Sequence, residues 1–338
     1  MLRSSNRTTR LVALAAATPL VLAACGGDSD TEGSSESGSA EASASGSESG
    51  SGGGDQPFPA IGDVKGTLTG DGSSTVFPIM EAVAEEISIE NSGVNLQVGL
   101  SGTGGGFERF CAGETDFSNA SRPIKPEEEQ ACADGGVEFT EFLVASDGIS
   151  VVSNTGTEIS CMTTEELQQV FGAEGPSTYA EVNSEFPDQP IAGFIPGTDS
   201  GTYDFFFEEV LEEAIDFKSG FTQSEDDNSL VTGIEGTEGG IGFFGFAYYE
   251  ENADQLNLVS IDDGNGCTEP SQDTIREGEY TPLSRPLFVY MKNEALETDL
   301  GKAVIGYVLT TGRELVTEVG YVQRTEEEYE ESISKIAA

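Results

Sequence analysis

The chain has 338 residues, enough for two domains with sizeable cores. Its 15 lysines and arginines are outnumbered by 61 aspartates and glutamates, so the formal net charge is −46, and it contains no histidine. This balance argues against binding to nucleic acid or to a membrane surface by charge, and it removes the commonest general base and metal ligand. We hypothesise that the acidity keeps the protein soluble at high ionic strength.

The N-terminus has the pattern of an export signal. Three arginines lie within the first ten residues, an apolar run shorter than a typical membrane span covers 11–22, and Leu22-Ala23-Ala24-Cys25 follows. These four residues resemble a bacterial lipobox, which predicts a signal peptide over 1–24 and a lipid on Cys25, with a plain signal peptide as the alternative. Residues 25–60 are then the lipidated cysteine and a disordered acidic Gly/Ser tether.

Export makes the other four cysteines candidates for two disulfides. The sequence leaves three pairings open, and we favour Cys111 with Cys132, which closes a local loop, and Cys161 with Cys267, a long-range link. A metal site is the alternative, but there is no Cys-x-x-Cys spacing and no histidine to support it. We expect neither a metal nor a cofactor.

From Val64 on, short apolar runs alternate with amphipathic helical stretches, which is typical of α/β folds. We predict strands at 66–68, 94–98, 139–144, 149–152 and 287–291, and helices at 78–90, 106–112, 163–171, 301–309 and 314–319. Asp147-Gly148 marks a crossing point between two strands, and 116–123 is predicted to be a loop. Thr164 is the expected N-cap and Gly172 the expected stop of the 163–171 helix. The glycines and aromatics of 239–249 indicate tight core packing more than a ligand platform.

Three loops rich in serine, threonine and glycine each precede a predicted helix, at 72–78, 101–106 and 197–202. The helix after the third has its apolar face at Phe207, Val210, Leu211, Ala214 and Ile215. A helix N-terminus binds anions because its first N–H groups are unpaired and it carries a partial positive charge. Ordinary capping by Asp199 or Ser200 would explain one such loop. Three that converge would hold one small oxyanion.

Four motifs occur in order along the chain: Gly-Ser-Ser-Thr-Val-Phe-Pro at 72–78, Ser-Gly-Thr-Gly-Gly-Gly-Phe at 101–107, Asp-Phe with Ala-Ser-Arg-Pro within 116–123, and Asp-Ser-Gly-Thr at 199–202. Over about residues 64–330 the chain resembles the phosphate-binding lipoproteins of bacterial phosphate ABC transporters. The resemblance implies an α/β, two-lobed fold of the periplasmic-binding-protein type (type II, Venus flytrap). Lobe 1 would cover 61–143 and 286–338 and lobe 2 would cover 144–285, with two crossovers between them and phosphate bound in the cleft.

The family's phosphate ligands carry over to the loops of this chain. They are Ser74, Thr75 and Val76 in the first loop, Ser101 or Thr103 in the second, and Ser200, Gly201 and Thr202 at the third.

Two positions depart from the better-known family pattern. Ser121, which we also expect to bind phosphate, stands where many members have an aspartate that accepts the phosphate proton, and Pro196 stands where they have an arginine. We expect Arg122 to supply the cation, unless it is tied to a surface carboxylate. Asp147 and Asp199 are the candidates for the missing proton acceptor.

The resemblance implies a monomeric, non-enzymatic solute-binding protein outside the cell or in the periplasm. It would touch the membrane only through the lipid on Cys25, capture inorganic phosphate and deliver it to an ABC permease. Another tetrahedral oxyanion such as sulfate, arsenate or a molybdate-like ion is an alternative ligand. An extracellular phosphatase is a further alternative, although the chain has no histidine, no nucleophile elbow and no metal-ligand cluster. A sensor or adhesin that works without a permease also remains open.

Overall fold

The computed structural model describes residues 57–198 and 200–337. The predicted export signal, Cys25, most of the tether and Asp199 lie outside these ranges. None of the described helices is long and apolar enough to span a bilayer. The described residues also contain no group of cysteines and carboxylates placed to hold a metal ion.

Helices and strands alternate along the chain, as the sequence predicts. The strands are β1 (Gly66–Gly72), β2 (Val94–Val98), β3 (Phe117–Ala120), β4 (Phe139–Asn154), β5 (Cys161–Thr163), β6 (Ala192–Pro196), β7 (Thr222–Ser224), β8 (Gly240–Gly245), β9 (Leu256–Asp262), β10 (Cys267–Thr268) and β11 (Ser284–Lys292). The helices are α1 (Phe77–Glu90), α2 (Gly102–Cys111), α3 (Pro126–Gly135), α4 (Thr164–Phe171), α5 (Tyr179–Val182), α6 (Gly201–Glu209), α7 (Asp227–Gly236), α8 (Phe246–Glu251), α9 (Gln272–Arg276), α10 (Asn293–Leu296), α11 (Asp299–Leu309), α12 (Arg313–Glu318) and α13 (Glu326–Ser334), with 3-10 turns at η1 (Ile61–Asp63) and η2 (Lys335–Ala337).

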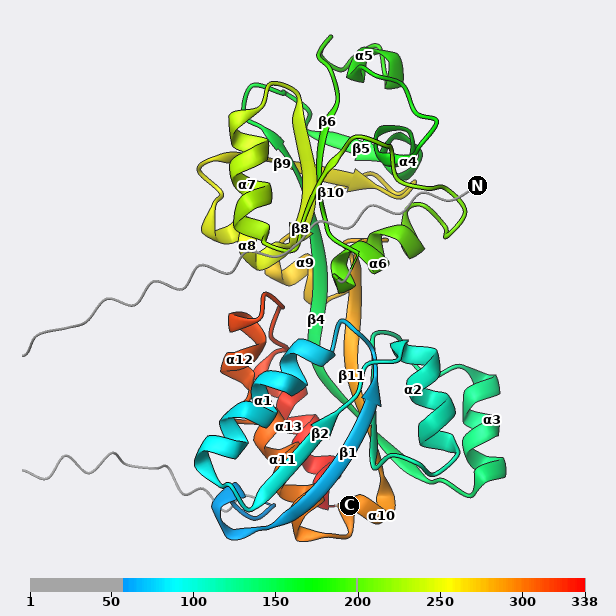
Figure 1. Cartoon of the computed structure of the whole chain (residues 1–338), viewed down its shortest axis with the longest axis vertical. Coiled ribbons are helices and arrows are strands. Elements are labelled where there is room, and N and C mark those ends of the chain that lie inside the picture. Colours follow the sequence, from blue (N-terminus) through cyan, green and yellow to red (C-terminus); the bar gives the residue numbers. More distant parts are fainter. Residues whose placement is uncertain (1–56, 199, 338) are drawn as a thin grey trace, which may run out of the picture. The chain divides into compact units, whose positions relative to one another are not determined.

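Two sheet regions share the long strand β4 and form the two lobes (Figure 1). In lobe 1 the strand order is β2-β1-β3-β11-β4. Strand β1 runs parallel to β2 and β3, and β11 is antiparallel to both β3 and β4. In lobe 2 the far half of β4 pairs with β8 and β9, and β8 continues through β6 to β7. The mixed α/β, two-lobed fold is the one expected.

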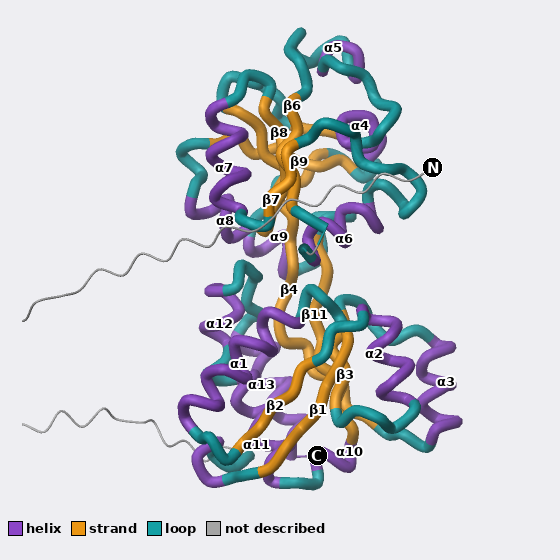
Figure 2. Tube along the Cα trace, in the orientation of Figure 1, coloured by secondary structure: helices purple, strands orange, loops and turns teal. Residues whose placement is uncertain are grey.

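Strands β4 and β11 run between the lobes (Figure 2). β4 pairs with β11 up to Gly148, with β8 from Ile149 and with β9 from Val151. The strands predicted at 139–144 and 149–152 are therefore one strand, and the predicted crossing point Asp147-Gly148 lies inside it. The lobe boundaries at 143/144 and 285/286 stay a prediction.

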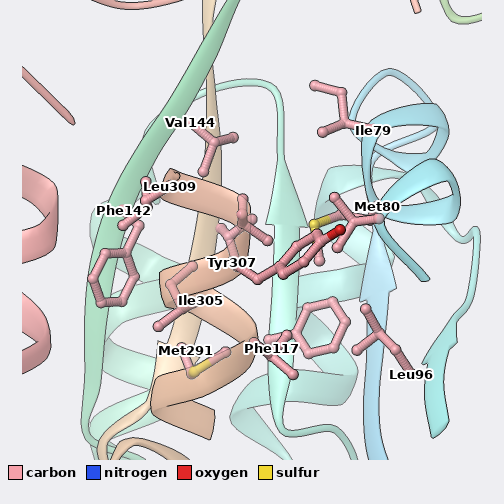
Figure 3. Close-up of a cluster of buried hydrophobic side chains, with 14 of the residues drawn as sticks. Ile79, Met80, Leu96, Phe117, Phe142, Val144, Met291, Ile305, Tyr307 and Leu309 are labelled. Carbon is pink, nitrogen blue, oxygen red and sulfur yellow. The ribbon is translucent and has the colours of Figure 1, made fainter. Parts of the chain in front are cut away.

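Each lobe has its own apolar core. In lobe 1, α1 and α11 pack on the sheet, and Met80, Phe117, Ile305 and Leu309 are buried there (Figure 3). In lobe 2, aromatic rings pack among aliphatic side chains, with Phe206 stacked on Phe243 at a centroid distance of 3.9 Å. Such dense packing fixes the loops that leave the sheets toward the crossing strands.

A third segment also joins the lobes, which the expectation of two crossovers did not include. Ser146 and Val322 form an antiparallel bridge with N–H to carbonyl distances of 2.8 and 2.9 Å. Val322 packs in the core of lobe 2, whereas Val316 and Tyr329 on either side pack in the core of lobe 1. The chain therefore visits lobe 2 briefly between α12 and α13.

Several local predictions need correction. Strand β3 occupies Phe117–Ala120, inside the predicted loop 116–123, and α2 begins at Gly102 rather than at 106. The cap of α4 is Thr163, whose hydroxyl accepts from Glu166 N–H, and not Thr164. Helix α6 ends at Glu209, and the following turn contains Glu212 and Glu213 with φ of 55° and 52°, so the helix cannot continue through them. The apolar helix face predicted to reach Ile215 is therefore wrong beyond Glu209.

Both predicted disulfides are present. Cys111 pairs with Cys132 and ties α2 to α3, and Cys161 pairs with Cys267 and ties β5 to β10. The metal-site alternative for these cysteines is wrong. The glycines of 240–245 are buried in β8, as core packing requires.

Candidate anion-binding cleft

A cleft of about 780 Å³ lies where loops from both lobes meet the crossing strands. Lobe 1 contributes residues of the first two predicted loops, and lobe 2 contributes the exposed side of α6. Among the lining residues are Ser74, Thr75, Thr103, Ser121, Arg122, Asp204, Phe205, Glu208 and Arg285. Hydroxyls, cations and carboxylates therefore face the same space.

The first loop leads into α1 and is held by Ser73, which the sequence reasoning did not single out. Its hydroxyl accepts hydrogen bonds from the N–H groups of Thr75 at 3.2 Å and Val76 at 3.4 Å. Ser73, Thr75 and Val76 are buried, whereas Ser74 is partly exposed toward the cleft. The N-terminal end of α1 is therefore fixed in place at the cleft wall.

The second loop settles which hydroxyl is near the cleft. Thr103 lines it and bonds to Ser121, with 3.1 Å between the two hydroxyl oxygens and 3.2 Å from Ser121 N–H to Thr103 Oγ1. Ser101 is exposed at the start of α2 and does not line the cleft. Of the two competing residues, only Thr103 is placed to meet a ligand in the cleft.

The third loop meets the first loop from the opposite lobe. Ser200 caps α6 by accepting from Thr202 N–H at 3.2 Å, so the capping interpretation is correct for this loop. A Cβ on Gly201 would lie 3.0 Å from Thr75 Oγ1 and 3.2 Å from Thr75 N, so glycine allows the close approach. Ser200, Gly201 and Thr202 do not line the cleft.

Arg122 lines the cleft but is already paired. Both terminal nitrogens of its guanidinium donate to the Glu128 carboxylate at 2.8 Å. The hydrogen bonds that Arg122 donates to Glu128 raise the pKa of Arg122. Burial opposes ionisation of Glu128, but the bonds from Arg122 and from Lys125 N–H lower its pKa overall. Arg122, which we expected to supply the cation, is therefore paired with a carboxylate, which was the alternative to a role in ligand binding.

A second arginine, Arg285 on β11, lies deeper in the cleft and was missed by the sequence reasoning. Its side chain is 11% exposed. Nε donates to Asp147 Oδ2 at 3.2 Å, and Nη2 donates to Thr75 Oγ1 at 2.5 Å and to the Gly201 carbonyl at 3.3 Å. Its only sequence signal is its position next to the predicted 285/286 lobe boundary.

The comparisons with known proteins agree on one family. The profile of the PBP superfamily domain matches residues 38–311. Protein SphX of Synechococcus elongatus is 46% identical over 262 residues, covering 76% of this chain and 77% of that protein. Phosphate-binding protein PstS of Staphylococcus haemolyticus is 39% identical over 277 residues, covering 81% and 86%. This chain belongs to the PstS/SphX family of the PBP superfamily.

A solved relative supports the fold of this PstS/SphX family member directly. The crystal structure of a possible phosphate-binding protein from Planctomyces limnophilus is 42% identical and superposes with a TM-score of 0.76, covering 81% of this chain and all of that chain. The resemblance inferred from the four motifs is therefore confirmed at the level of family and fold.

The two residues that depart from the better-known family pattern lie in different lobes. Ser121 is tied to Thr103, and Pro196 ends β6 in the interior of lobe 2. Asp147, a predicted candidate for the proton acceptor, faces Arg285 and does not line the cleft. Asp204 and Glu208 of α6 do line it, and burial raises the pKa of both while Arg285 opposes the shift.

Proposed function

We propose that the protein is a lipid-anchored solute-binding protein that captures inorganic phosphate outside the cell and delivers it to an ABC permease for import. The observation that carries the proposal is the meeting of loops from the two lobes at one cleft. Thr75 of the first loop and Gly201 of the third are in contact range, and Thr103 and Ser121 line the same space. PstS of Staphylococcus haemolyticus, a relative of this chain, is named as a phosphate-binding protein.

Phosphate would be held by short-range contacts. The proposed ligands are Ser74, Thr75 and Val76, Thr103 in preference to Ser101, Ser121 and Arg122, and Ser200, Gly201 and Thr202. A helix N-terminus and hydroxyl donors bind an oxyanion at contact distance without a large net positive charge. The binding step requires no covalent chemistry.

The acidity of the chain makes this local design necessary. At a net charge of −46 the protein repels phosphate, and salt at moderate concentration screens this repulsion only at separations beyond about 8–10 Å, so it persists near the protein. Capture therefore depends on donors inside the cleft and on closure of the lobes around the ion. Closure shifts the balance between open and closed populations, and the closed form would be the one that the permease recognises.

Phosphate uptake by cells of the source organism tests delivery and anchoring together. Deleting the gene is expected to abolish high-affinity uptake of radiolabelled phosphate, and re-expressing the chain is expected to restore it. A Cys25→Ser variant, which cannot carry the lipid, is expected to appear in the medium and to restore little uptake. Unchanged uptake in the deletion strain would contradict the proposal.

The phosphatase alternative is tested with the same protein. The purified full-length chain is expected to leave p-nitrophenyl phosphate intact. Release of nitrophenol that depends on the chain would favour an enzyme instead.

A further inference from the structure

Arg285 occupies a distinctive position among the cations that line the cleft. It stands on β11, one of the two crossing strands, and its direct cross-strand partner is Asp147 on β4, the other crossing strand. Arg122 and Lys125, the other lining cations, both come from the segment between β3 and α3. Arg285 is therefore the cleft cation whose backbone belongs to the connection between the lobes.

Its guanidinium contacts the first loop, which belongs to lobe 1, and the third loop, which belongs to lobe 2. Nη2 donates to the Thr75 hydroxyl of lobe 1 and to the Gly201 carbonyl of lobe 2. Nη1 makes no hydrogen bond to the described residues, and its nearest carboxylate oxygen, on Glu208, is 3.9 Å away. Since Arg285 lines the cleft, donors on Nη1 are available to a ligand that lies between these loops.

The plane of the guanidinium is fixed from two sides. Its central carbon lies 3.7 Å from the centroid of the Phe205 ring, and Nε is bonded to Asp147. A planar fork that is held in one orientation loses little freedom when it binds an oxyanion through two parallel hydrogen bonds.

The burial of the Asp147 carboxylate is expected to lower the stability of the fold. Its side chain is 1% exposed, and its Oδ1 accepts no hydrogen bond from the described residues. Burial raises the pKa of Asp147, and the nearby Arg285 opposes that shift. A buried carboxylate that is only partly satisfied is destabilising, so pure stability would favour an apolar residue at this position.

We propose that Arg285 binds the oxyanion in the cleft and that Asp147 is the positioning residue that holds the Arg285 guanidinium in its binding orientation. The inference rests on the proposed phosphate-binding function and adds the residues that serve it. In this chain Arg285 takes the place of the arginine that the family pattern has where Pro196 stands. Asp147 then supports the cation and is not the acceptor of the phosphate proton.

The test is calorimetric titration of the purified full-length protein with inorganic phosphate. Arg285→Gln is expected to lower affinity roughly 10- to 100-fold, the range for losing hydrogen bonds from a charged group. Arg285→Lys keeps the charge but loses the fork, so it is expected to fall between the wild type and Arg285→Gln. The matched control is Arg313→Gln, because Arg313 also pairs with a carboxylate, Glu326, and stacks on a ring, Tyr329, but lies outside the cleft.

A double-mutant cycle separates positioning by Asp147 from a purely structural role. Asp147→Asn alone is expected to weaken phosphate binding by roughly 3- to 10-fold, and to have no further effect in the Arg285→Gln background. A structural distortion would instead weaken binding equally in both backgrounds.

The outcomes distinguish the inference from the function on which it rests. If the wild type binds no phosphate, the proposed function fails. If the wild type binds phosphate and Arg285→Gln binds within twofold of it, Arg285 is not a ligand and the inference fails. If Arg285→Gln does not fold, Arg285→Lys decides, since affinity equal to the wild type would contradict a fork-dependent role.

Discussion

Asp227, the first residue of α7, carries a charge that is costly at neutral pH. Burial raises its pKa to about 6, and repulsion from Asp226 and then Glu225 acts in the same direction. A carboxyl whose pKa is higher in the folded state binds more protons there than in the unfolded state. Its contribution to stability therefore falls as pH rises from about 4 to about 6. Above this window the ionised Asp227 lowers the free energy of unfolding by on the order of 2–3 kcal/mol.

We predict that Asp227→Asn raises the free energy of unfolding by roughly 1–2 kcal/mol at pH 7.5 and leaves it nearly unchanged at pH 4. Urea unfolding at the two pH values measures this. The control is Asp299→Asn, because Asp299 is also the first residue of a helix, α11, but is exposed. Equal changes in the two variants, or a loss of stability for Asp227→Asn at pH 7.5, would contradict the explanation.

At the scale of single residues, the sequence predicts loops better than side-chain partners. The Ser/Thr/Gly loops could be found because glycine and hydroxyl residues before a helix have a local meaning. Thr75 and Thr103, both predicted ligands, line the cleft. Arg285 could not be found in this way, because its partners Asp147 and Thr75 are 138 and 210 residues away along the chain. Only the fold brings such residues together.

Helix α2 packs directly on strand β1 at a glycine. A Cβ on Gly106 would lie 2.5 Å from the Gly72 α-carbon and 3.1 Å from the Asp71 carbonyl oxygen, both backbone atoms that cannot rotate away. Helix α2 would have to move, and Thr103, one turn earlier, would move with it.

We therefore predict that Gly106→Ala lowers the free energy of unfolding by about 1–3 kcal/mol and also weakens phosphate binding. Gly104→Ala in the same helix is the control, because nothing lies within 4 Å of its added Cβ. This variant is expected to be neutral or up to about 1 kcal/mol more stable, since alanine favours helix over glycine. Thermal unfolding of the two variants measures the difference, and equal effects would show that the contact with β1 does not matter.

At the scale of elements, hydrophobic periodicity and segment length predicted part of the framework, chiefly β1, β2, β4 and β11 with α1, α2, α4, α6, α11 and α12. Strand β2 has the predicted bounds, and α1 and α11 differ from prediction by one or two residues. The helix predicted to reach Ile215 ends at Glu209 and is followed by left-handed Glu212 and Glu213, a conformation that glutamate residues do not indicate in a sequence. The single strand β4 was read as two because its polar centre, Ser146 to Gly148, is buried between the lobes.

At the scale of the whole molecule, four ordered motifs predicted the family and the two-lobed fold. They could not predict the third passage through Val322, because one apolar residue in a connection carries no pattern.

The two disulfides lie in different lobes, and each closes one element onto another within its own lobe. Neither of them links the lobes, so covalent bonds between cysteines leave the crossing strands free to bend.

The negative net charge of the protein opposes the binding of an anion. A protein of charge −46 must bind an anion, and the cleft lines up Asp204 and Glu208 beside Arg285 and Arg122. A carboxylate that faces the ligand can accept a hydrogen bond from the proton that phosphate carries near neutral pH. It disfavours the binding of sulfate, which carries no proton and would place a second acceptor against the carboxylate. This arrangement would supply the selectivity that Ser121 cannot.

The most direct measurement is calorimetric titration of the purified full-length protein, first with phosphate and then with sulfate, at one fixed high salt concentration. We predict tight one-to-one binding of phosphate and no heat of binding with sulfate. Comparable binding of sulfate would show that the cleft accepts tetrahedral oxyanions in general, and the absence of phosphate binding would contradict the proposed function itself.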